Sequence, residues 1–297
     1  MIPVFNRLQI KRQRARSALP PKDKAAQAPY FLFDWTLDRI EERIGIIRRD
    51  FPVCLRLGAR GKPIEASIQG MEYHFTADSF YGCAAEERFI LCDEEFLPFA
   101  ARSIDLFYSP LNLHSVNDLP GTLLQIRQSL KDDGLFIAAM LGGETLYELR
   151  ECLSLAEMEI TGGISPRIAP FADKPQMGML LQRAGFALPV VDSDIVRVSY
   201  QSVFDLMRDL RLMGEANALD ARAGNFTRRS VFMRCAELYA QKYPAPDGRI
   251  NASFEVIFLH GWAPHESQQK PLAPGSAKER LAAILGTEEI GTGEKPL

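Results

Sequence analysis

A glycine turn and two aspartates stand at the ends of three short apolar segments, and their residue types together suit the binding of a nucleoside. Gly58 opens a turn rich in glycine and charge, in which backbone N–H groups can approach a ligand closely. Asp78 comes about 20 positions later, where a carboxylate can accept two hydrogen bonds from ribose hydroxyls. Asp93 can accept a hydrogen bond from an exocyclic amino group such as that of adenine. Each aspartate alone is more often a cap or turn former, but the order of the three predicts one nucleoside pocket.

Three more polar residues border the same predicted pocket. Glu94 follows Asp93 in an acidic loop, and Ser109 ends an apolar strand expected over residues 105–109. His114 lies in the polar loop after that strand, beside the expected position of a substrate, where it would act as general base or orient the substrate. A hydrogen-bonded loop residue is the alternative for His114. The histidines and cysteines lack the spacing of zinc ligands, so no metal site is expected.

The elements that must position these residues alternate between strands and helices. Short apolar runs predict the strands, and apolar residues at helical spacing predict amphipathic helices between them. The strands are expected over residues 53–57, 73–77, 89–92, 105–109, 134–140, 190–200 and 254–260, and the helices over 31–48, from about 117 to 134, and over 177–185, 202–214 and 230–243. This alternation predicts an α/β fold with a doubly wound parallel sheet. In such sheets ligands bind beyond the carboxyl ends of the strands.

Two connecting segments carry local predictions. Thr145 and Glu148 have the spacing of a capping box at the start of a helix. Residues 214–229 are small, polar and basic, which predicts an exposed crossover.

Composition excludes several classes of protein. The 297 residues are 46% hydrophobic and 25% charged, which is ordinary for a folded protein, and no apolar run approaches the ~20 residues of a membrane span. The net charge of −3 gives no indication of a partner, and no nucleic acid is expected. The five cysteines contain no Cys-x-x-Cys pair, which predicts buried thiols in a reducing compartment.

The first 22 residues are basic and contain no acid. A solvated arm or helix is the favoured interpretation. The alternatives are contact with an acidic partner, RNA or an anionic membrane surface, and an organelle transit peptide.

Nearly the whole chain resembles a known family. The order of glycine turn, strand-end Asp78, acidic loop 93–99 and polar loop 113–118 resembles the class I S-adenosylmethionine-dependent methyltransferase superfamily. More narrowly, the sequence is similar to the methyltransferase-like complex I assembly factor 5 group, and more distantly to the malonyl-carrier-protein methyltransferase of biotin synthesis. The segments that carry the narrower resemblance are 5–7, 11–12, 142–150, 162–166, 261–262, 265–268 and 274–277.

The resemblance implies a fold, a domain organisation and a cofactor. The fold would be a seven-stranded, mostly parallel sheet with helical N-terminal and lid elements, whose last strand runs antiparallel at the sheet edge. The chain would consist of a basic arm at 1–30, a methyltransferase-like domain at 31–267 with helical insertions at about 141–180 and 201–250, and a disordered tail at 268–297. S-adenosylmethionine would be the cofactor. Its binding residues would be Gly58, Gly61, Asp78, Asp93, Glu94 and Ser109, with His114 as the catalytic residue.

The glycine turn departs from the family pattern Asp-Leu-Gly-x-Gly-x-Gly. Arg56 stands where an acid would face the ammonium group of the cofactor, and Arg60 and Lys62 flank Gly61. Because the sulfonium cofactor is cationic, a like charge at about 4 Å would cost several kcal/mol at an effective dielectric constant of about 20. Either these charges abolish cofactor binding, or the side chains point to solvent and the cofactor still binds.

The sequence thus predicts an S-adenosylmethionine-dependent methyltransferase-like protein that acts on a protein substrate, a complex I subunit, during complex I assembly. Two alternatives stay open. One is an arginine hydroxylase of a complex I subunit, and the other is a non-catalytic assembly platform with a degraded cofactor motif. The expected location is the bacterial cytoplasm, with contact between the basic N-terminal arm and the inner membrane as a further alternative.

Overall fold

The computed structural model describes residues 3–18, 30–64, 68–80, 88–269, 276, 284 and 286–287. The chain forms two compact units, Met1–Pro264 and His265–Leu297, and every helix and strand named below belongs to the first. Most of the tail predicted for 268–297 lies outside the described residues.

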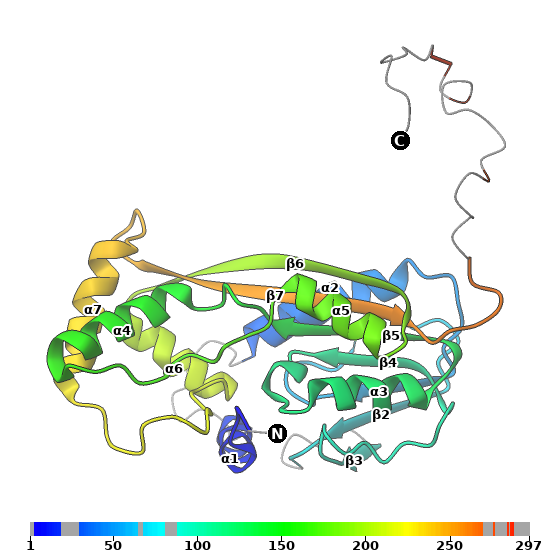
Figure 1. The fold of residues 1–297 in the computed structure, drawn as a ribbon, viewed down its shortest axis with the longest axis horizontal. Helices are drawn as coiled ribbons and strands as arrows, with labels where there is room; N and C mark the ends of the chain where they lie inside the picture. The colour runs from blue at the N-terminus through cyan, green and yellow to red at the C-terminus, as the bar shows by residue number, and fades with distance from the viewer. Residues whose placement is uncertain are drawn as a thin grey trace, which may run out of the picture. The chain divides into compact units, whose positions relative to one another are not determined.

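Within the described residues, seven strands form one mixed sheet (Figure 1). They are β1 Val53–Leu57, β2 Tyr73–Asp78, β3 Phe89–Leu91, β4 Ile104–Pro110, β5 Leu130–Leu141, β6 Ala187–Tyr200 and β7 Ile250–Trp262. The order is β3-β2-β1-β4-β5-β7-β6, with parallel pairs from β3 to β5 and with β7 antiparallel to both of its neighbours. This confirms the predicted doubly wound, seven-stranded, mostly parallel sheet. The predicted edge position of the last strand is wrong, because β7 lies between β5 and β6.

The alternation of side chains along the strands separates two hydrophobic layers. In β4, Leu106 and Tyr108 pack in one layer and Phe107 packs in the other, because successive side chains point to opposite faces of a sheet. Helix α2 (Phe31–Gly45) packs in the first layer, and α3 (Leu119–Ser129) and α5 (Lys174–Arg183) pack in the second. Both faces of the sheet are therefore covered, which leaves the carboxyl ends of the parallel strands as the place for a polar site.

Helices α4 (Tyr147–Thr161), α6 (Val203–Met213) and α7 (Arg229–Lys242) lie in the segments where helical insertions were expected. The predicted capping box at the start of α4 is wrong, since the N-cap residue is Leu146, whose backbone is left-handed and whose side chain makes no cap. The Thr145 hydroxyl donates instead to the Glu255 carbonyl at 3.1 Å. Glu148 accepts a hydrogen bond from the Ser253 hydroxyl at 2.6 Å. Both side chains therefore attach the start of α4 to β7.

The basic N-terminal segment forms helix α1 (Arg7–Ser17), which packs against α6 in the first unit. The Asn6 side chain caps its start by accepting a hydrogen bond from the Gln9 backbone at 2.9 Å. The apolar anchor of this region is a small cluster of Phe5, Ile10 and Leu219. The predicted helix is therefore present, but the prediction that this segment is solvated is wrong, because the helix is docked on the sheet end.

No helix among the described residues is long and apolar enough to cross a membrane. The four cysteines that the structure describes are reduced and buried, which confirms the prediction of buried thiols for these positions: Cys54, Cys92, Cys152 and Cys235.

Candidate functional site

The carboxylate of Asp78, at the end of β2, lies beside the glycine turn as predicted. One oxygen, Oδ2, accepts a hydrogen bond from the Ala59 backbone N–H at 2.8 Å. The other, Oδ1, lies 3.2 Å from the guanidinium Nη1 of Arg14. Asp78 is 1% exposed, so the residue expected to bind a ribose is buried and paired with a cation from α1.

Glu94 is the most enclosed acid of the site, with no exposed surface. Its carboxylate pairs with the guanidinium groups of Arg14 and Arg7 and accepts a hydrogen bond from the Asn112 side chain at 3.1 Å. Asp93, the neighbouring acid, lies 2.8 Å from Arg7 and 3.5 Å from Lys11. The two predicted binding acids of this loop are therefore engaged by the chain itself.

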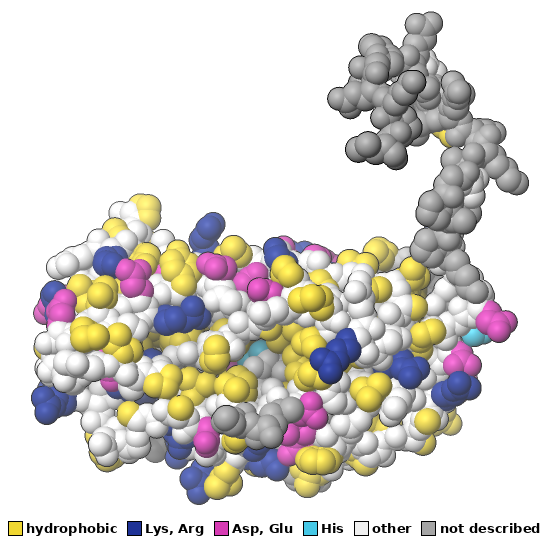
Figure 2. Space-filling model, viewed as in Figure 1, with side chains coloured by type: hydrophobic (Ala, Val, Ile, Leu, Met, Phe, Trp, Pro, Cys, Tyr) yellow, Lys and Arg dark blue, Asp and Glu magenta, His cyan; other side chains and the backbone are white. Residues whose placement is uncertain are grey.

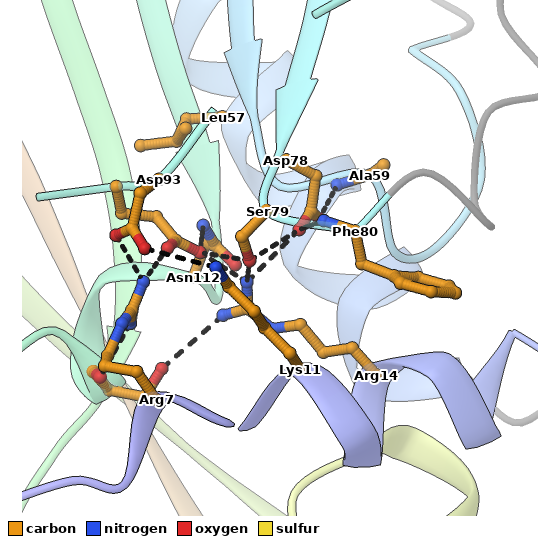
Figure 3. Close-up of polar contacts among 12 residues, drawn as sticks. Arg7, Lys11, Arg14, Leu57, Ala59, Asp78, Ser79, Phe80, Asp93 and Asn112 are labelled. Atoms are coloured by element: carbon orange, nitrogen blue, oxygen red, sulfur yellow. Dashed lines mark hydrogen bonds and ion pairs between the residues drawn. The ribbon is translucent and has the colours of Figure 1, made fainter. Parts of the chain in front are cut away.

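The three cations come from one face of α1, since residues 7, 11 and 14 follow helical spacing. Figure 3 shows Arg7, Lys11 and Arg14 reaching from the helix toward the strand ends. Burial alone would raise the pKa of Glu94, but Arg14 and Arg7 hold it well below its usual range. Burial alone would lower the pKa of Arg14, and Glu94 and Asp78 raise it above its usual value. Glu94 and Arg14 are therefore both ionised at neutral pH.

The side chain of Arg56 is folded into the glycine turn. It is 1% exposed and donates hydrogen bonds to the backbone carbonyls of Gly58 at 2.8 Å, Arg60 at 2.6 Å and Lys62 at 2.8 Å. The alternative in which this side chain points to solvent is wrong. Arg56 fixes the shape of the turn by satisfying its carbonyl groups.

Arg60 is also buried, and it extends away from the turn toward the other strand ends. Its guanidinium donates to the Leu111 carbonyl at 3.1 Å and pairs with Glu215 at 2.5 Å. It also lies over the ring of Phe33, 4.4 Å from the ring centre, which is a favourable cation–π geometry. The solvent-facing alternative is wrong for Arg60 as well.

The two glycines of the turn are in close contact with side chains of the same chain. Both have positive φ angles, +104° at Gly58 and +86° at Gly61, where side chains are disfavoured. A Cβ at Gly58 would lie 2.9 Å from Cβ of Asn112, and one at Gly61 would lie 2.9 Å from Cβ of Phe33. The internal packing of the turn is sufficient to require glycine at both positions.

In this arrangement the residues do not fit S-adenosylmethionine, the cofactor that the fold implies. Arg14 takes Asp78, the carboxylate expected to bind its ribose, and Arg7 and Lys11 take Asp93, the carboxylate expected to bind its adenine. Arg14 and Arg60 are fixed positive charges beside the place of a cationic sulfonium.

The remaining predicted site residues lie in two different environments. The Ser109 hydroxyl is buried and donates to the Leu57 carbonyl at 2.9 Å, so that it links β4 to β1. His114 Nε2 lies 3.0 Å from the carboxylate of Glu215, while its Nδ1 is buried without a hydrogen-bond partner among the described residues. Burial would raise the pKa of Glu215, but His114 and Arg60 lower it to about 2. Glu215 is therefore a carboxylate that pairs with the guanidinium of Arg60 and lies within hydrogen-bond distance of the His114 imidazole.

A cavity of about 280 Å³ adjoins this cluster. Its wall is mostly apolar, with contributions from α1, α2, α4, α6 and α7, and its polar lining includes Arg14, His114, Glu215 and Arg167. Figure 2 shows hydrophobic side chains around the hollow in the middle of this face, with histidine atoms visible inside. Neither Asp78 nor Glu94 lines the cavity, because Arg14 lies between them and the cavity space.

The residues of the site that were not predicted from the sequence include Arg7, Lys11, Arg14, Asn112 and Glu215. The helical spacing of the basic residues in α1 was a usable signal for one charged face, but no pattern pairs that face with acids about 80 residues away. Glu215 lies in the segment predicted as an exposed crossover, where its 15% exposed side chain instead pairs with Arg60 and lies 3.0 Å from His114.

Comparison with known proteins supports the same fold. A sequence-family profile described as a methyltransferase domain matches residues 63–138. The crystal structure of the YcgJ protein from Bacillus subtilis superposes with a TM-score of 0.51 at 12% identity, over 78% of this chain and 99% of that one.

Curated relatives match over more of the sequence. The mitochondrial arginine-hydroxylase NDUFAF5 of Mus musculus is 38% identical over 308 residues, 98% of this chain and 87% of that protein. The protein of the same name from Homo sapiens is 39% identical over 287 residues, 92% of this chain and 81% of that protein. A malonyl-[acyl-carrier protein] O-methyltransferase of Xylella fastidiosa is 37% identical over 172 residues, 58% of this chain and 56% of that protein.

The sheet order, the flanking helices and the matched profile define a protein of the class I methyltransferase fold. Within this class, identity of nearly 40% over most of both chains decides the family. The chain belongs to the family of the arginine-hydroxylase NDUFAF5.

Proposed function

We propose that this chain hydroxylates an arginine side chain of a protein substrate. The observation that carries the proposal is the acid cluster at the strand ends, which binds guanidinium groups: Glu94 and Asp78 hold Arg14, and Asp93 holds Arg7. Carboxylates suit a guanidinium because it is planar, permanently charged and rich in hydrogen-bond donors. The relatives named arginine-hydroxylases support the same class of substrate.

In the proposed reaction, one oxygen atom of dioxygen enters a C–H bond of the arginine side chain. The second oxygen atom leaves as water, with two electrons and two protons supplied by a reductant. The residues of this chain bind and orient the substrate, since carboxylates fix the guanidinium and the apolar cavity wall surrounds its aliphatic part. His114 lies at the cavity wall, where an imidazole can transfer a proton.

We further propose a subunit of respiratory complex I as the protein substrate, because the sequence resembles the complex I assembly factor group. Membrane contact of the basic arm, which was one alternative from the sequence, has less support than binding within the chain. Three of the basic side chains of the arm, those of Arg7, Lys11 and Arg14, pair with acids of the same chain. The cytoplasmic location stays a prediction.

The reaction is tested by mass spectrometry of complex I subunits from cells that contain the wild-type chain, no chain, or a Glu94→Gln variant. The proposal expects an arginine peptide heavier by one oxygen atom with the wild type, its absence without the chain, and at least a tenfold loss with Glu94→Gln. Glu42→Gln is the matched control, because Glu42 is an exposed carboxylate on α2 that pairs with Arg39. An oxidised arginine peptide that appears equally without the chain would contradict the proposal.

S-adenosylmethionine-dependent methylation of a protein substrate is the second candidate. It is favoured by the match to a methyltransferase domain and by the position of Asp78 at the end of β2 beside the glycine turn, where an acid that binds ribose hydroxyls is expected. Because Arg14 takes the same carboxylate, cofactor binding would require its release. Titration calorimetry with S-adenosylmethionine on the wild type and on Arg14→Ala tests this candidate. No binding to either protein at millimolar ligand would exclude it.

The two candidates differ in the modification that the same mass spectra would show, since methylation adds CH₂ and hydroxylation adds an oxygen atom. If neither modification depends on the chain, the non-catalytic assembly platform is the alternative that is left.

A further inference from the structure

Helix α1 is attached to the strand ends mainly by charge. Its apolar anchor is limited to Ile10, which packs with Phe5 and Leu219. The other buried residues of the helix are the polar Gln13, Arg14 and Ser17. Replacing a buried ion pair by apolar residues is often neutral or stabilising, so stability alone is a weak reason for burying Arg14 at 1% exposure.

We propose that Arg14 occupies the site that receives the substrate arginine, so that α1 is an internal competitor of the substrate. This inference rests on the proposed function and names the binding site and its regulation. The site consists of Glu94 and Asp78, with the hydroxyl of Ser79 at 3.0 Å from the same guanidinium nitrogen of Arg14.

The position of the cavity supports this assignment. Arg14 lines the cavity on one side and contacts Glu94 and Asp78 on the other, and neither acid lines the cavity. An arginine that enters through the cavity therefore reaches the two carboxylates only when Arg14 leaves them. The Nε of Arg14 is buried without a hydrogen-bond partner among the described residues. The guanidinium group of Arg14 therefore does not satisfy all of its hydrogen-bond donors in this position.

The remaining charges make the exchange feasible. Glu94 has Arg7, the first residue of the same helix, as a second cationic partner, so the acid keeps a cation when Arg14 moves out while the start of α1 stays docked. A substrate guanidinium then restores the charge that Arg14 supplied. An ammonium group is a poorer substitute, because it lacks the planar fork of donors that matches two carboxylates.

The test is titration calorimetry of the full chain with N-acetyl-L-arginine amide as the probe. The proteins are the wild type, Arg14→Ala, and Arg16→Ala as a matched control, because Arg16 is an exposed residue of the same helix. We expect Arg14→Ala to bind the arginine amide at least tenfold more tightly than the wild type and Arg16→Ala to match the wild type, because a side chain tethered in place competes at high effective concentration. The amides of N-acetyl-lysine and N-acetyl-citrulline should bind Arg14→Ala at least tenfold more weakly.

Two results would overturn the inference. One is equal affinity of the wild type and Arg14→Ala for the arginine amide, and the other is unchanged affinity when Glu94→Gln is added to Arg14→Ala. If Arg14→Ala does not fold, Arg14→Lys replaces it, because it keeps the charge and lacks the fork; it should also bind the arginine amide more tightly than the wild type.

A second measurement uses the wild type alone. Hydrogen exchange of the backbone amides of residues 11–17 should become faster when the arginine amide is added and should not change with the citrulline amide. If exchange is unchanged at an arginine amide concentration about one hundred times the Kd of Arg14→Ala, the helix is not displaced and the inference is wrong. Arginine binding without hydroxylation would refute the proposed reaction alone, and hydroxylation without any gain in Arg14→Ala would refute this inference alone.

Discussion

Replacing Arg14 by alanine measures how strongly the buried charges stabilise the docked helix. Glu94 would lose Arg14 and keep Arg7, and Asp78 would keep, among the described residues, only uncharged donors such as the backbone N–H groups of Ala59 and Phe80. Removing one partner of a buried pair costs about 3–5 kcal/mol. Because Arg7 and the Asn112 amide remain on Glu94, we expect a loss near the low end, about 3 kcal/mol at pH 7.

The loss should also depend on pH. The pKa of Glu94 in the folded protein is below its ordinary value because of Arg14 and Arg7. A lowered carboxyl pKa stabilises the fold above the unfolded pKa of about 4.3, and this contribution disappears as the pH falls through the folded value. The difference between wild type and Arg14→Ala should therefore be complete at pH 7 and smaller at pH 3.

Urea unfolding followed by tryptophan fluorescence is the suitable assay. Guanidinium chloride is unsuitable, because guanidinium ions would bind to the carboxylates that Arg14 vacates. Arg16→Ala, at an exposed position of the same helix, should change the free energy of unfolding by no more than about 0.5 kcal/mol. A loss below about 1 kcal/mol for Arg14→Ala at pH 7, or an equal loss at pH 3 and pH 7, would refute the reasoning.

Three further predictions concern the turn, the second acid and the core. Gly58→Ala should destabilise the protein by about 2 kcal/mol because of its positive φ and the 2.9 Å approach to Cβ of Asn112. Adding Asn112→Gly, which removes that Cβ, should relieve only the steric part, and urea unfolding without loss would show that the turn can adapt. Glu215→Gln should be less stable than the wild type at pH 7 by about 3 kcal/mol. The pKa of Glu215 is lowered to about 2, so its contribution to the free energy of unfolding is complete above the ordinary pKa of a glutamate. This contribution is lost as the pH falls toward 2, and the stabilities of the wild type and Glu215→Gln should converge there. Ile257→Ala, at a fully buried position of β7, should lower the free energy of unfolding by about 2–5 kcal/mol. Ile195→Ala, at a half-exposed position of β6, should lower the midpoint of thermal unfolding much less than Ile257→Ala does.

Most of the fold could be predicted because it depends on local patterns. The apolar run at 53–57 is β1 to the residue, and the other strands differ from their predicted bounds by a few residues at their ends. The caps Asp118 and Ser202 follow from local hydrogen bonds, and both accept a bond from the backbone of the first helical turn. The predicted capping box at Thr145 was wrong because its side chains found partners on β7, about 110 residues away.

The candidate site could be predicted only in part. The sequence predicted that Asp78 and the glycine turn share one pocket at the strand ends, and in the structure Asp78 accepts a hydrogen bond from the Ala59 amide of that turn. The sequence left Arg60 with two alternatives, facing the cofactor or facing solvent. Burial against Phe33 and pairing with Glu215 were not among them, since both partners come from distant segments.

The sequence by itself determined the order of strands and helices, the polar character of the strand ends and the family, because periodicity, caps and motifs are properties of short segments. Only the tertiary structure decided what those strand ends hold. Arg14, which pairs with both Glu94 and Asp78, comes from a helix more than 60 residues earlier in the chain, and the strength of a buried charge pair depends on which opposite charges share its enclosure. That enclosure exists only after α1 has docked against the sheet.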